Sequence, residues 1–424
     1  MKRSGGAIAN RGQKVSRQRY VEHPTTQRCC YGLDSAAHRA RLPARTRDGR
    51  FSIEPAVCGL LPDRRRGSTF VGGGRTCWRT ARFPLDSRRT LVTRVGENGR
   101  IYKSENDRRP DAALRRLPGH LVSFARFVSR REQRERADRS TLADLVRVSL
   151  PLADGLELEW LGTAGYRLTY AGHSLLIDPY LSRIPLSAVL RRRTVLADPT
   201  SHAPLLARGI GSVEGILLGH THFDHAMDVP ALAHTFNTKA YGSDSLMRLM
   251  ALYEMRDRAV EVRPHHPYEL GPFTVTFVPS LHSKLVLGFK VPYDGALSCE
   301  HLDQLSAAEY KCGAVYGIRI EVAGTTLYHQ GSANVIDDEV PTGGVDIFLA
   351  GLAGRSFTPG YWRRVLGRLQ PAVIVASHFD DFFRPLTAPL GFTTNVNLTA
   401  FPDEIAAISR TIAVAALAPP AMAS

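Results

Sequence analysis

The sequence lacks any run of about eighteen consecutive apolar residues, the length that a membrane-spanning helix needs. Its basic N-terminus is not followed by the apolar stretch of a secretory signal. None of the six cysteines has CxxC spacing, which argues against a zinc ribbon and favours free thiols. We therefore expect a cytoplasmic protein without a transmembrane segment.

Lysine is scarce in the first third of the chain, although that part is strongly basic. Residues 1–150 contain 34 Lys and Arg against 14 Asp and Glu, and only 3 of the 34 are lysine. An Arg-rich arm could bind nucleic acid or an anionic membrane. A poorly folded extension, or a start codon set too far upstream, accounts for the same composition, and we favour these two interpretations.

The pattern of the chain changes near residue 156. Residues 1–110 are rich in Arg, Gly and Pro without a sustained period, and residues 111–155 are predicted as a helical lead-in, with a helix at Leu114–Ala137. Over residues 156–415, short apolar segments alternate with Gly turns and amphipathic segments. This alternation predicts one domain of strands backed by helices.

The elements predicted within residues 156–415 fall into two sets of strands, each backed by helices. This arrangement indicates a four-layer αββα sandwich of the α/β (α+β) class. Strands are predicted at Leu156–Leu161, Tyr166–Tyr170, Ser174–Ile177, Val213–Leu218, Phe273–Val278, Val315–Val322, Thr325–Tyr328, Val345–Ala350 and Ala372–Ser377. Helices are predicted at Val229–His234, Ser245–Tyr253, Tyr361–Leu369 and Asp403–Ala413.

A cluster of metal-binding residue types follows the strand at Val213–Leu218. His220, His222, Asp224 and His225 lie within a run of six residues. Imidazole nitrogen and carboxylate oxygen are standard ligands of Zn²⁺ and related ions. Three histidines at this spacing are hard to explain as core packing, because an unpaired polar group is costly to bury. The cluster therefore predicts a metal site.

The run resembles the HxHxDH signature of the metallo-β-lactamase superfamily, over about residues 156–400. The resemblance implies two groups of ligands: His220, His222 and His282 for one ion, and Asp224, His225 and His378 for another. The resemblance also implies that Asp178, in the LIDP-like segment Leu175–Pro179, supports the ligands from behind without binding metal itself.

The sequence departs from the family at one place. The family carries a Gly-Asp pair whose Asp bridges both metals, whereas Ser332 stands in that position here. A serine hydroxyl brings no negative charge, so a second ion could be weak, absent, or completed by His329, Asp337 or Asp338. We expect Zn²⁺, one or two ions per chain with one held tightly, and Mn²⁺ or Fe²⁺ as alternatives.

The resemblance implies a metal-dependent hydrolase in which Asp224 orients a metal-activated hydroxide as well as binding metal. The expected substrate is a small-molecule ester, lactone, amide or phosphodiester, and the chain most resembles the ascorbate-6-phosphate lactonase-like branch. A phosphodiesterase like N-acyl-phosphatidylethanolamine phospholipase D, a nucleic-acid-processing protein and a non-catalytic metal-binding relative are alternatives. The slightly acidic balance of residues 151–424 disfavours nucleic acid as a partner.

Substrate contacts are the least specific predictions. Arg355 follows a predicted strand and could hold a carboxylate or phosphate. Asp381 could line the pocket or cap a turn, and the segment Pro292–Gly313 could form a lid. The sequence does not indicate an oligomeric state.

Overall fold

The structure is a computed structural model, and it describes residues 94–95, 101–102, 130–285, 289–393 and 396–418. The predicted basic extension over residues 1–110 lies outside the described residues, apart from the antiparallel pairing of β1 (Arg94–Val95) with β2 (Ile101–Tyr102). Four of the six cysteines lie outside them as well.

The first of the two large sheets has six strands in the order β3-β4-β5-β6-β7-β8. It begins with an antiparallel meander and continues with parallel strands. Its strands are β3 (Leu156–Gly162), β4 (Gly165–Tyr170), β5 (His173–Ile177), β6 (Ser212–Leu217), β7 (Ala240–Gly242) and β8 (Ala259–Glu261).

The second sheet repeats this plan with seven strands in the order β15-β14-β13-β12-β11-β10-β9. The pairs from β9 to β12 are antiparallel, and those from β12 to β15 are parallel. Its strands are β9 (Pro267–Leu270), β10 (Phe273–Ser280), β11 (Val315–Val322), β12 (Thr325–Gln330), β13 (Ile347–Gly351), β14 (Val373–Ser377) and β15 (Ala413–Ala416).

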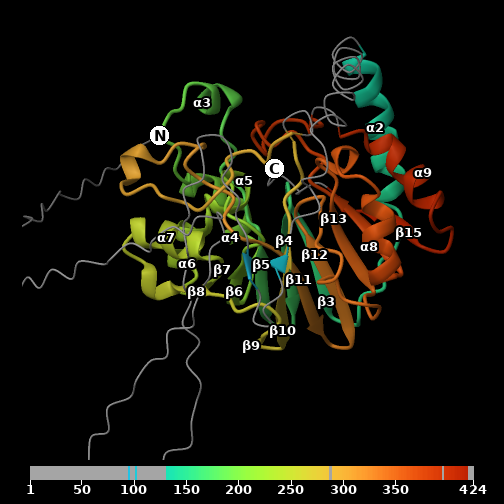
Figure 1. Ribbon diagram of the computed structural model, residues 1–424, viewed down its shortest axis with the longest axis horizontal. Coiled ribbons are helices and arrows are strands. Elements are labelled where there is room, and N and C mark those ends of the chain that lie inside the picture. The colour runs from blue at the N-terminus through green and yellow to red at the C-terminus, as the bar shows by residue number, and fades with distance from the viewer. Residues whose placement is uncertain (1–93, 96–100, 103–129, 286–288, 394–395, 419–424) are drawn as a thin grey trace, which may run out of the picture. The chain divides into compact units, whose positions relative to one another are not determined.

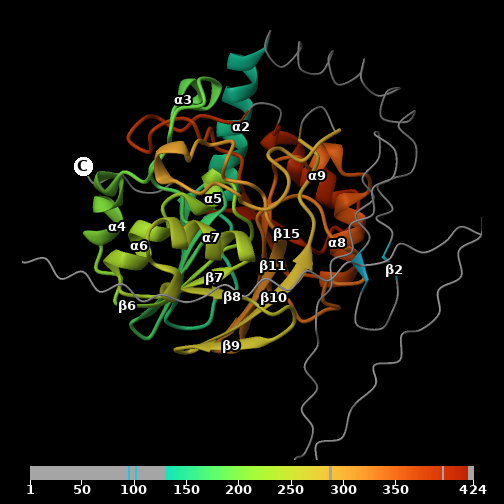
Figure 2. The ribbon, with the colours of Figure 1, turned by 60° about the vertical axis from the view of Figure 1, so that its left-hand side comes forward.

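Helices cover the outer faces of both sheets, as Figures 1 and 2 show. On the side of the first sheet lie α4 (Ala203–Leu206), α5 (Phe223–Ala226), α6 (Val229–Thr235) and α7 (Asp244–Leu252). On the side of the second sheet lie α2 (Arg131–Leu145), α8 (Tyr361–Leu369) and α9 (Phe401–Ala406). The helix α3 (Leu186–Leu190) projects from the loop after β5. The predicted four-layer αββα sandwich is confirmed.

Two apolar clusters hold these layers together. The larger one fills the space between the sheets and under α8 and α9, with Trp160, Phe277 and Phe348 fully buried. The smaller one packs α5, α6 and α7 against the first sheet through side chains such as Met227 and Leu249. Burying a large apolar side chain stabilises the fold by about 1.5–3 kcal/mol. The two clusters therefore stabilise the strands whose ends carry the polar loops.

The predicted strands are all present, with bounds that shift by at most a few residues, but two helix predictions needed correction. The described part of the predicted lead-in helix begins at Arg131 and continues to Leu145, beyond the predicted end at Ala137. The predicted closing helix at Asp403–Ala413 ends at Ala406, and the chain then forms β15. Ala has a strong helix preference, but here the parallel ladder that β15 makes with β14 outweighs it.

Within the described residues, no helix is long and apolar enough to cross a membrane. The cytoplasmic location stays a prediction.

Candidate metal centre

The predicted ligands lie where strands of both sheets end at one edge. Strand β6 ends at Leu217, and the chain then passes through His220 and His222 into the short helix α5. In the second sheet, β10 ends at Ser280 just before His282, and β14 ends at Ser377 directly before His378. Loops at the carboxyl ends of strands are where open α/β sheets bind ligands.

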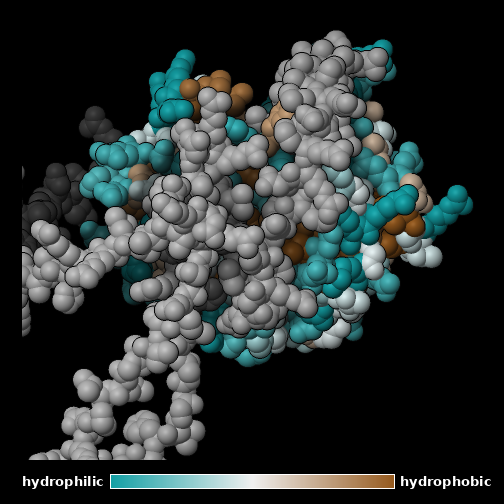
Figure 3. Space-filling view, viewed as in Figure 1, coloured by the Kyte–Doolittle hydropathy of each residue, from teal (hydrophilic) through white to brown (hydrophobic). Residues whose placement is uncertain are grey.

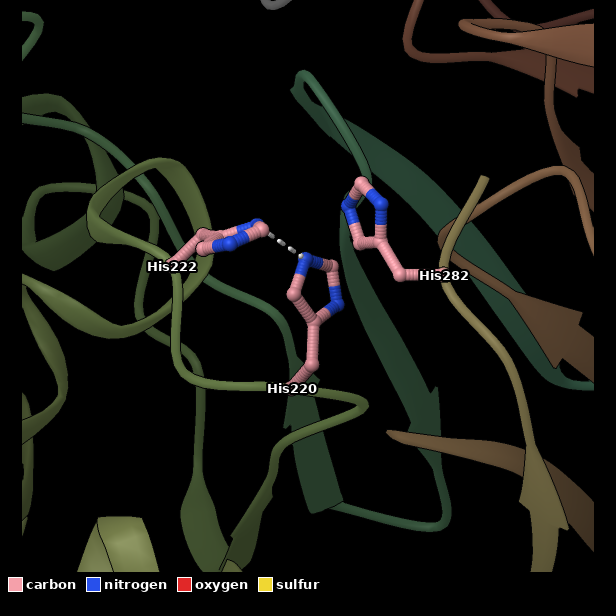
Figure 4. A group of neighbouring side chains, drawn as sticks. All are labelled: His220, His222 and His282. Carbon is pink, nitrogen blue, oxygen red and sulfur yellow. Dashed lines mark hydrogen bonds between the residues drawn. The ribbon is translucent and has the colours of Figure 1, made fainter. Parts of the chain in front are cut away.

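The structure brings the six predicted ligands together in two groups. We call His220, His222 and His282 the three-histidine group, and Asp224, His225 and His378 the carboxylate group. In each group the candidate ligand atoms lie within 4.8 Å of one another, and all six side chains are buried. Figure 4 shows the imidazole rings of the three-histidine group turned toward one another, although they come from two sheets.

Hydrogen bonds to the backbone fix which nitrogen of two histidines carries a proton. His222 donates from Nε2 to the carbonyl of Pro292 at 2.8 Å, and His282 donates from Nδ1 to the carbonyl of Ser283 at 2.7 Å. The lone pairs therefore lie on Nδ1 of His222 and Nε2 of His282. The former nitrogen is 3.1 Å from Nε2 of His220. Such backbone contacts orient metal-binding histidines in proteins.

Burial keeps the three-histidine group uncharged. Loss of water around the ring lowers the pKa of His222 to about 4. Burial, followed by the charges of neighbouring histidines, also lowers the pKa of His220 and His282 well below the ordinary range. Neutral imidazole is the form that binds a cation, so these side chains need not lose a proton at pH 7 to do so.

The carboxylate group has the opposite electrostatic character. Burial opposes ionisation of Asp224, but the nearby His225 and His378 outweigh burial and lower the pKa of the carboxyl well below its ordinary value. Oδ2 of Asp224 lies 3.3 Å from Nε2 of His378 and 3.9 Å from Nε2 of His225. Burial also disfavours the protonated ring of His225, but Asp178 and Asp224 raise its pKa.

Asp178 lies behind the ligands, where the resemblance implies a supporting role. Its Oδ1 accepts the backbone N–H of Gly219 at 2.7 Å, and its Oδ2 lies 3.0 Å from Nδ1 of His225 and 2.9 Å from Nε2 of His329. Asp178 adopts a positive φ of 41°, which is rare for a residue with a side chain. His329 contacts Asp178 through Nε2, and its part as a replacement for the bridging ligand stays a prediction.

Ser332 lies beside the ligands and contributes no charge to them. Its Oγ accepts the backbone N–H of Ser283 at 3.0 Å, next to His282. The preceding Gly331 fits tightly, because a Cβ there would lie 3.2 Å from Cε1 of His225 and 2.8 Å from Oδ2 of Asp178. The segment therefore passes between the two groups without a carboxylate.

The other proposed replacements for the bridging ligand lie away from the ligands. Asp337 forms an ion pair with Arg364 at 2.7 Å, and the side chain of Asp338 is 96 % exposed. Neither completes the carboxylate group.

A buried ion pair that the sequence analysis missed fixes the loop of His378. The backbone N–H of His378 donates to the carbonyl of Thr163 at 2.7 Å, and the N–H of Thr163 donates to the Asp380 carboxylate at 3.0 Å. Arg183 donates to the same carboxylate at 2.7 Å, and both charged side chains are almost fully buried. Arg183 and Asp380 lie 197 residues apart, so the sequence does not indicate that they pair. The turn around Gly162 was the only local feature that pointed to this part of the fold.

The predicted substrate contacts have other partners. Arg355 is buried and donates to Glu404 at 2.7 Å and to the carbonyl of Asn397 at 2.7 Å, so its guanidinium is not free to hold a substrate. Asp381 accepts the backbone N–H of Phe383 at 3.2 Å and caps a turn. The segment Pro292–Gly313 contacts the HxHxDH run through the Pro292 carbonyl and forms a wall of the centre.

The donor set fits a divalent cation. Three buried neutral imidazoles that direct lone pairs toward one another form the nitrogen-rich ligand set that Zn²⁺ and related ions prefer. Nε2 of His220 lies at hydrogen-bond distance, 3.1 Å, from Nδ1 of His222, and no described side chain donates to Nε2 of His282. The arrangement is therefore hard to explain as core packing.

Comparisons with known proteins agree with this geometry. The family model described as "Beta-lactamase superfamily domain" matches residues 173–379. A UPF0173 metal-dependent hydrolase of Anaeromyxobacter sp. (strain K) is 29% identical over 237 residues, which covers 53% of this chain and 75% of that protein. A UPF0173 metal-dependent hydrolase of Cupriavidus taiwanensis is 27% identical over 267 residues, which covers 61% of this chain and 81% of that protein.

Among solved structures, the metallo-beta-lactamase fold protein YhfI from Bacillus subtilis is similar, with a TM-score of 0.38 and 17% identity. The match covers 64% of this chain and 92% of that chain. Igni18, a metallo hydrolase from Ignicoccus hospitalis, has a TM-score of 0.38 and 15% identity, and the match covers 62% of this chain and 95% of that chain.

Two mixed sheets flanked by helices, together with the matched family domain and the two ligand groups at one edge of the sheets, define a domain of the metallo-β-lactamase superfamily. The domain over residues 173–379 is that of a metal-dependent hydrolase of this superfamily, and the chain is similar to UPF0173 metal-dependent hydrolases.

Proposed function

We propose that the protein hydrolyses a small-molecule ester, lactone, amide or phosphodiester, with Zn²⁺ held tightly by His220, His222 and His282. The observation that carries the proposal is the convergence of three buried, neutral imidazoles beside a group that contains an ionised carboxylate. Mn²⁺ and Fe²⁺ suit the same donors, and Zn²⁺ is preferred because all three are nitrogen.

When bound, the cation supplies hydroxide at neutral pH by lowering the pKa of water from 15.7 to about 7, and it polarises the substrate oxygen. The chain's own residues then position the reaction. Asp224 stays ionised and orients the attacking water by accepting its hydrogen bond. Asp178 holds His225 in place, and the Pro292 carbonyl holds His222. The buried walls exclude bulk water and so strengthen the electrostatic contacts of the substrate.

We propose that a second ion in the carboxylate group is held more weakly. A bridging carboxylate would bring one further negative charge between two divalent cations, whereas Ser332 brings none. The hydroxyl of Ser332 is already engaged with the backbone N–H of Ser283. Two ions would therefore depend on an anion from solvent or substrate.

For the substrate, we propose a lactone as the first candidate, because residues 326–334 and 345–355 resemble the ascorbate-6-phosphate lactonase-like branch. A phosphodiester is the second candidate. Both react by attack of hydroxide on an electrophilic centre, so one site suits either of them.

The test combines metal content with turnover in one sample of the full chain. Bound metal is counted after dialysis, and hydrolysis of bis(p-nitrophenyl) phosphate and of a simple lactone is followed with added Zn²⁺ or Mn²⁺. We expect at least one ion per chain and turnover that Asp224→Ala abolishes. Asp338→Asn is the matched control, because this carboxylate is exposed and remote from the ligands.

Bound metal without turnover on any ester, lactone or phosphodiester would overturn the proposed hydrolysis and favour a metal-binding relative without catalysis. Absence of bound metal would overturn the metal centre itself.

A further inference from the structure

The helix α3 exposes large apolar side chains to water. Leu186 is 48% exposed and Leu190 is 75% exposed, and Leu196 in the following loop is 42% exposed. Most large apolar side chains of the two sheets are buried. Single exposed leucines are common, but three within eleven residues of a projecting loop form a local apolar surface that indicates an interaction site.

Three consecutive arginines follow the helix directly. Arg191, Arg192 and Arg193 are exposed, and no carboxylate among the described residues forms an ion pair with them. By contrast, Arg183, Arg355 and Arg364 each have an acidic partner. The tip of this loop therefore combines exposed leucines with uncompensated positive charge. We call residues 186–196 the α3 tip.

The α3 tip stands at the same end of the fold as the metal centre. Figures 1 and 2 both place α3 beyond α5, the helix that carries Asp224 and His225. In Figure 3, apolar and hydrophilic surface lie side by side at the place of α3.

The tip is also joined to the wall of the centre. The N–H of Val195 donates to the carbonyl of Leu305 at 2.9 Å, and Thr194 forms a β-bridge with Ser306. Both partners belong to the segment that includes Pro292, whose carbonyl accepts from His222.

We propose that the α3 tip docks the protein on an anionic lipid bilayer, with the leucines inserted at the headgroup boundary and the arginines on lipid phosphates. Interfacial binding of this kind adds the transfer of apolar surface to the attraction between basic side chains and anionic lipid. Arg suits phosphate because its planar guanidinium forms paired hydrogen bonds with it. Docking would place the metal centre at the membrane surface.

Other occupants fit the α3 tip less well. Nucleic acid would use the arginines, but it is bound through phosphate contacts and stacking on aromatic rings, which leaves the leucines without a partner. A second copy of the chain in a two-fold arrangement would bring the same patch against itself and therefore place the arginine runs close together. An anionic bilayer satisfies both the charge and the apolar side chains.

The test needs a reporter at the tip, because the basic first third of the chain could bind anionic vesicles by itself. Leu190→Trp in the full chain provides it, with vesicles of phosphatidylcholine and phosphatidylglycerol that contain brominated acyl chains. The native tryptophans are Trp78, Trp160 and Trp362, and subtraction of the wild-type spectrum removes their emission. We expect a blue shift and quenching with these vesicles, and little change with phosphatidylcholine alone.

Ile408→Trp is the matched control, since Ile408 is 36% exposed but follows α9, away from α3 in Figures 1 and 2. Its emission should not be quenched.

A second set of variants tests the charge. Arg191→Gln, Arg192→Gln and Arg193→Gln combined in the Leu190→Trp protein should weaken vesicle binding by roughly fivefold for each arginine removed. Replacing Arg248, Arg256 and Arg258 by Gln changes the net charge equally at another place and should have less effect.

Four outcomes would overturn the proposal. The first is that the emission of Leu190→Trp is not quenched although the chain sediments with vesicles, and the second is that Ile408→Trp is quenched equally. The third is a blue shift that grows with protein concentration in the absence of lipid. The fourth is a change in the emission of Leu190→Trp with an oligonucleotide but not with vesicles. Hydrolysis of bis(p-nitrophenyl) phosphate in solution should be unchanged in all these variants. Failure of docking is therefore distinguishable from failure of the proposed hydrolase activity.

Discussion

The two ligand groups lie side by side but differ in charge. In the three-histidine group, two rings are oriented by neutral backbone carbonyls, and burial keeps all three rings uncharged. In the carboxylate group, Asp224 faces His225 and His378, and Asp178 also contacts His225. The first group contains only neutral rings, whereas the second is already partly balanced by opposite charges.

This difference predicts unequal metal affinities. A cation entering the three-histidine group displaces neither a proton nor an ion-pair partner. A cation entering the carboxylate group must compete with the attraction between Asp224 and His225, whose pKa is raised. The missing carboxylate at Ser332 weakens the second site further. The first ion should therefore bind more tightly than the second.

The largest effect is expected from removal of one tight ligand. Loss of a residue that only supports a ligand lowers metal affinity by roughly 10–100-fold. We predict that His222→Ala, which removes a ligand itself, lowers metal affinity by more than this and abolishes turnover. The affinity is measured by competition with a chelator of known strength. His301→Ala is the control, because this histidine is exposed and outside both groups. Equal affinity in His222→Ala and the control would contradict the assignment.

Removal of Asp178 should act mainly on the carboxylate group. We predict that Asp178→Asn lowers affinity for the second ion by roughly 10–100-fold, because His225 loses its anionic partner. Urea unfolding of metal-free wild type and metal-free Asp178→Asn tests the effect of the Asp178 charge on stability separately from its effect on metal binding. Because His225 and His329 hold the pKa of Asp178 well below its ordinary value against the effect of burial, the carboxylate stabilises the fold above the unfolded-state pKa of about 3.9.

The stability difference between wild type and Asp178→Asn should therefore shrink as the pH falls below about 4. A difference that grows at acid pH would show that the folded-state pKa is raised instead.

Supplying the missing carboxylate should reduce the contrast between the groups. We predict that Ser332→Asp tightens the second ion by roughly tenfold, since an added anion lies between two cations. Ser332→Ala controls for loss of the hydroxyl and should leave the second affinity near that of wild type. Calorimetric titration of the metal-free proteins measures both. Equal second affinities in the Asp and Ala variants would mean that this residue does not reach the site.

The smallest effect on catalysis is expected at Arg355. Its guanidinium is bound to Glu404 and backbone carbonyls, so Arg355→Ala should leave the KM and both metal affinities unchanged. The free energy of unfolding should fall by about 2 kcal/mol, a value below that of fully buried pairs because Glu404 is partly exposed. A large rise in the KM of Arg355→Ala without loss of stability would contradict this and support the predicted contact of Arg355 with substrate.

Much of this centre could be predicted from the sequence because its signals are local. An apolar strand followed by His220 and His222 shows in a short window, and His282 and His378 each follow a recognisable strand. The sandwich follows from the repeated order of strands and helices.

The remaining features depend on contacts between distant segments. The ion pair of Arg183 with Asp380 and the contact of His329 with Asp178 join residues more than a hundred positions apart, so no short window could reveal them. The strand Ala413–Ala416 shows the same limit, since its alanines favour helix locally and only pairing with β14 makes them a strand.

Calorimetric titration of the metal-free full chain with Zn²⁺ tests the inequality of the two groups most directly. We predict one tight equivalent that His222→Ala removes, and a second equivalent at least roughly tenfold weaker that Ser332→Asp strengthens. Two equivalents of equal affinity, or a first equivalent that survives in His222→Ala, would contradict the account.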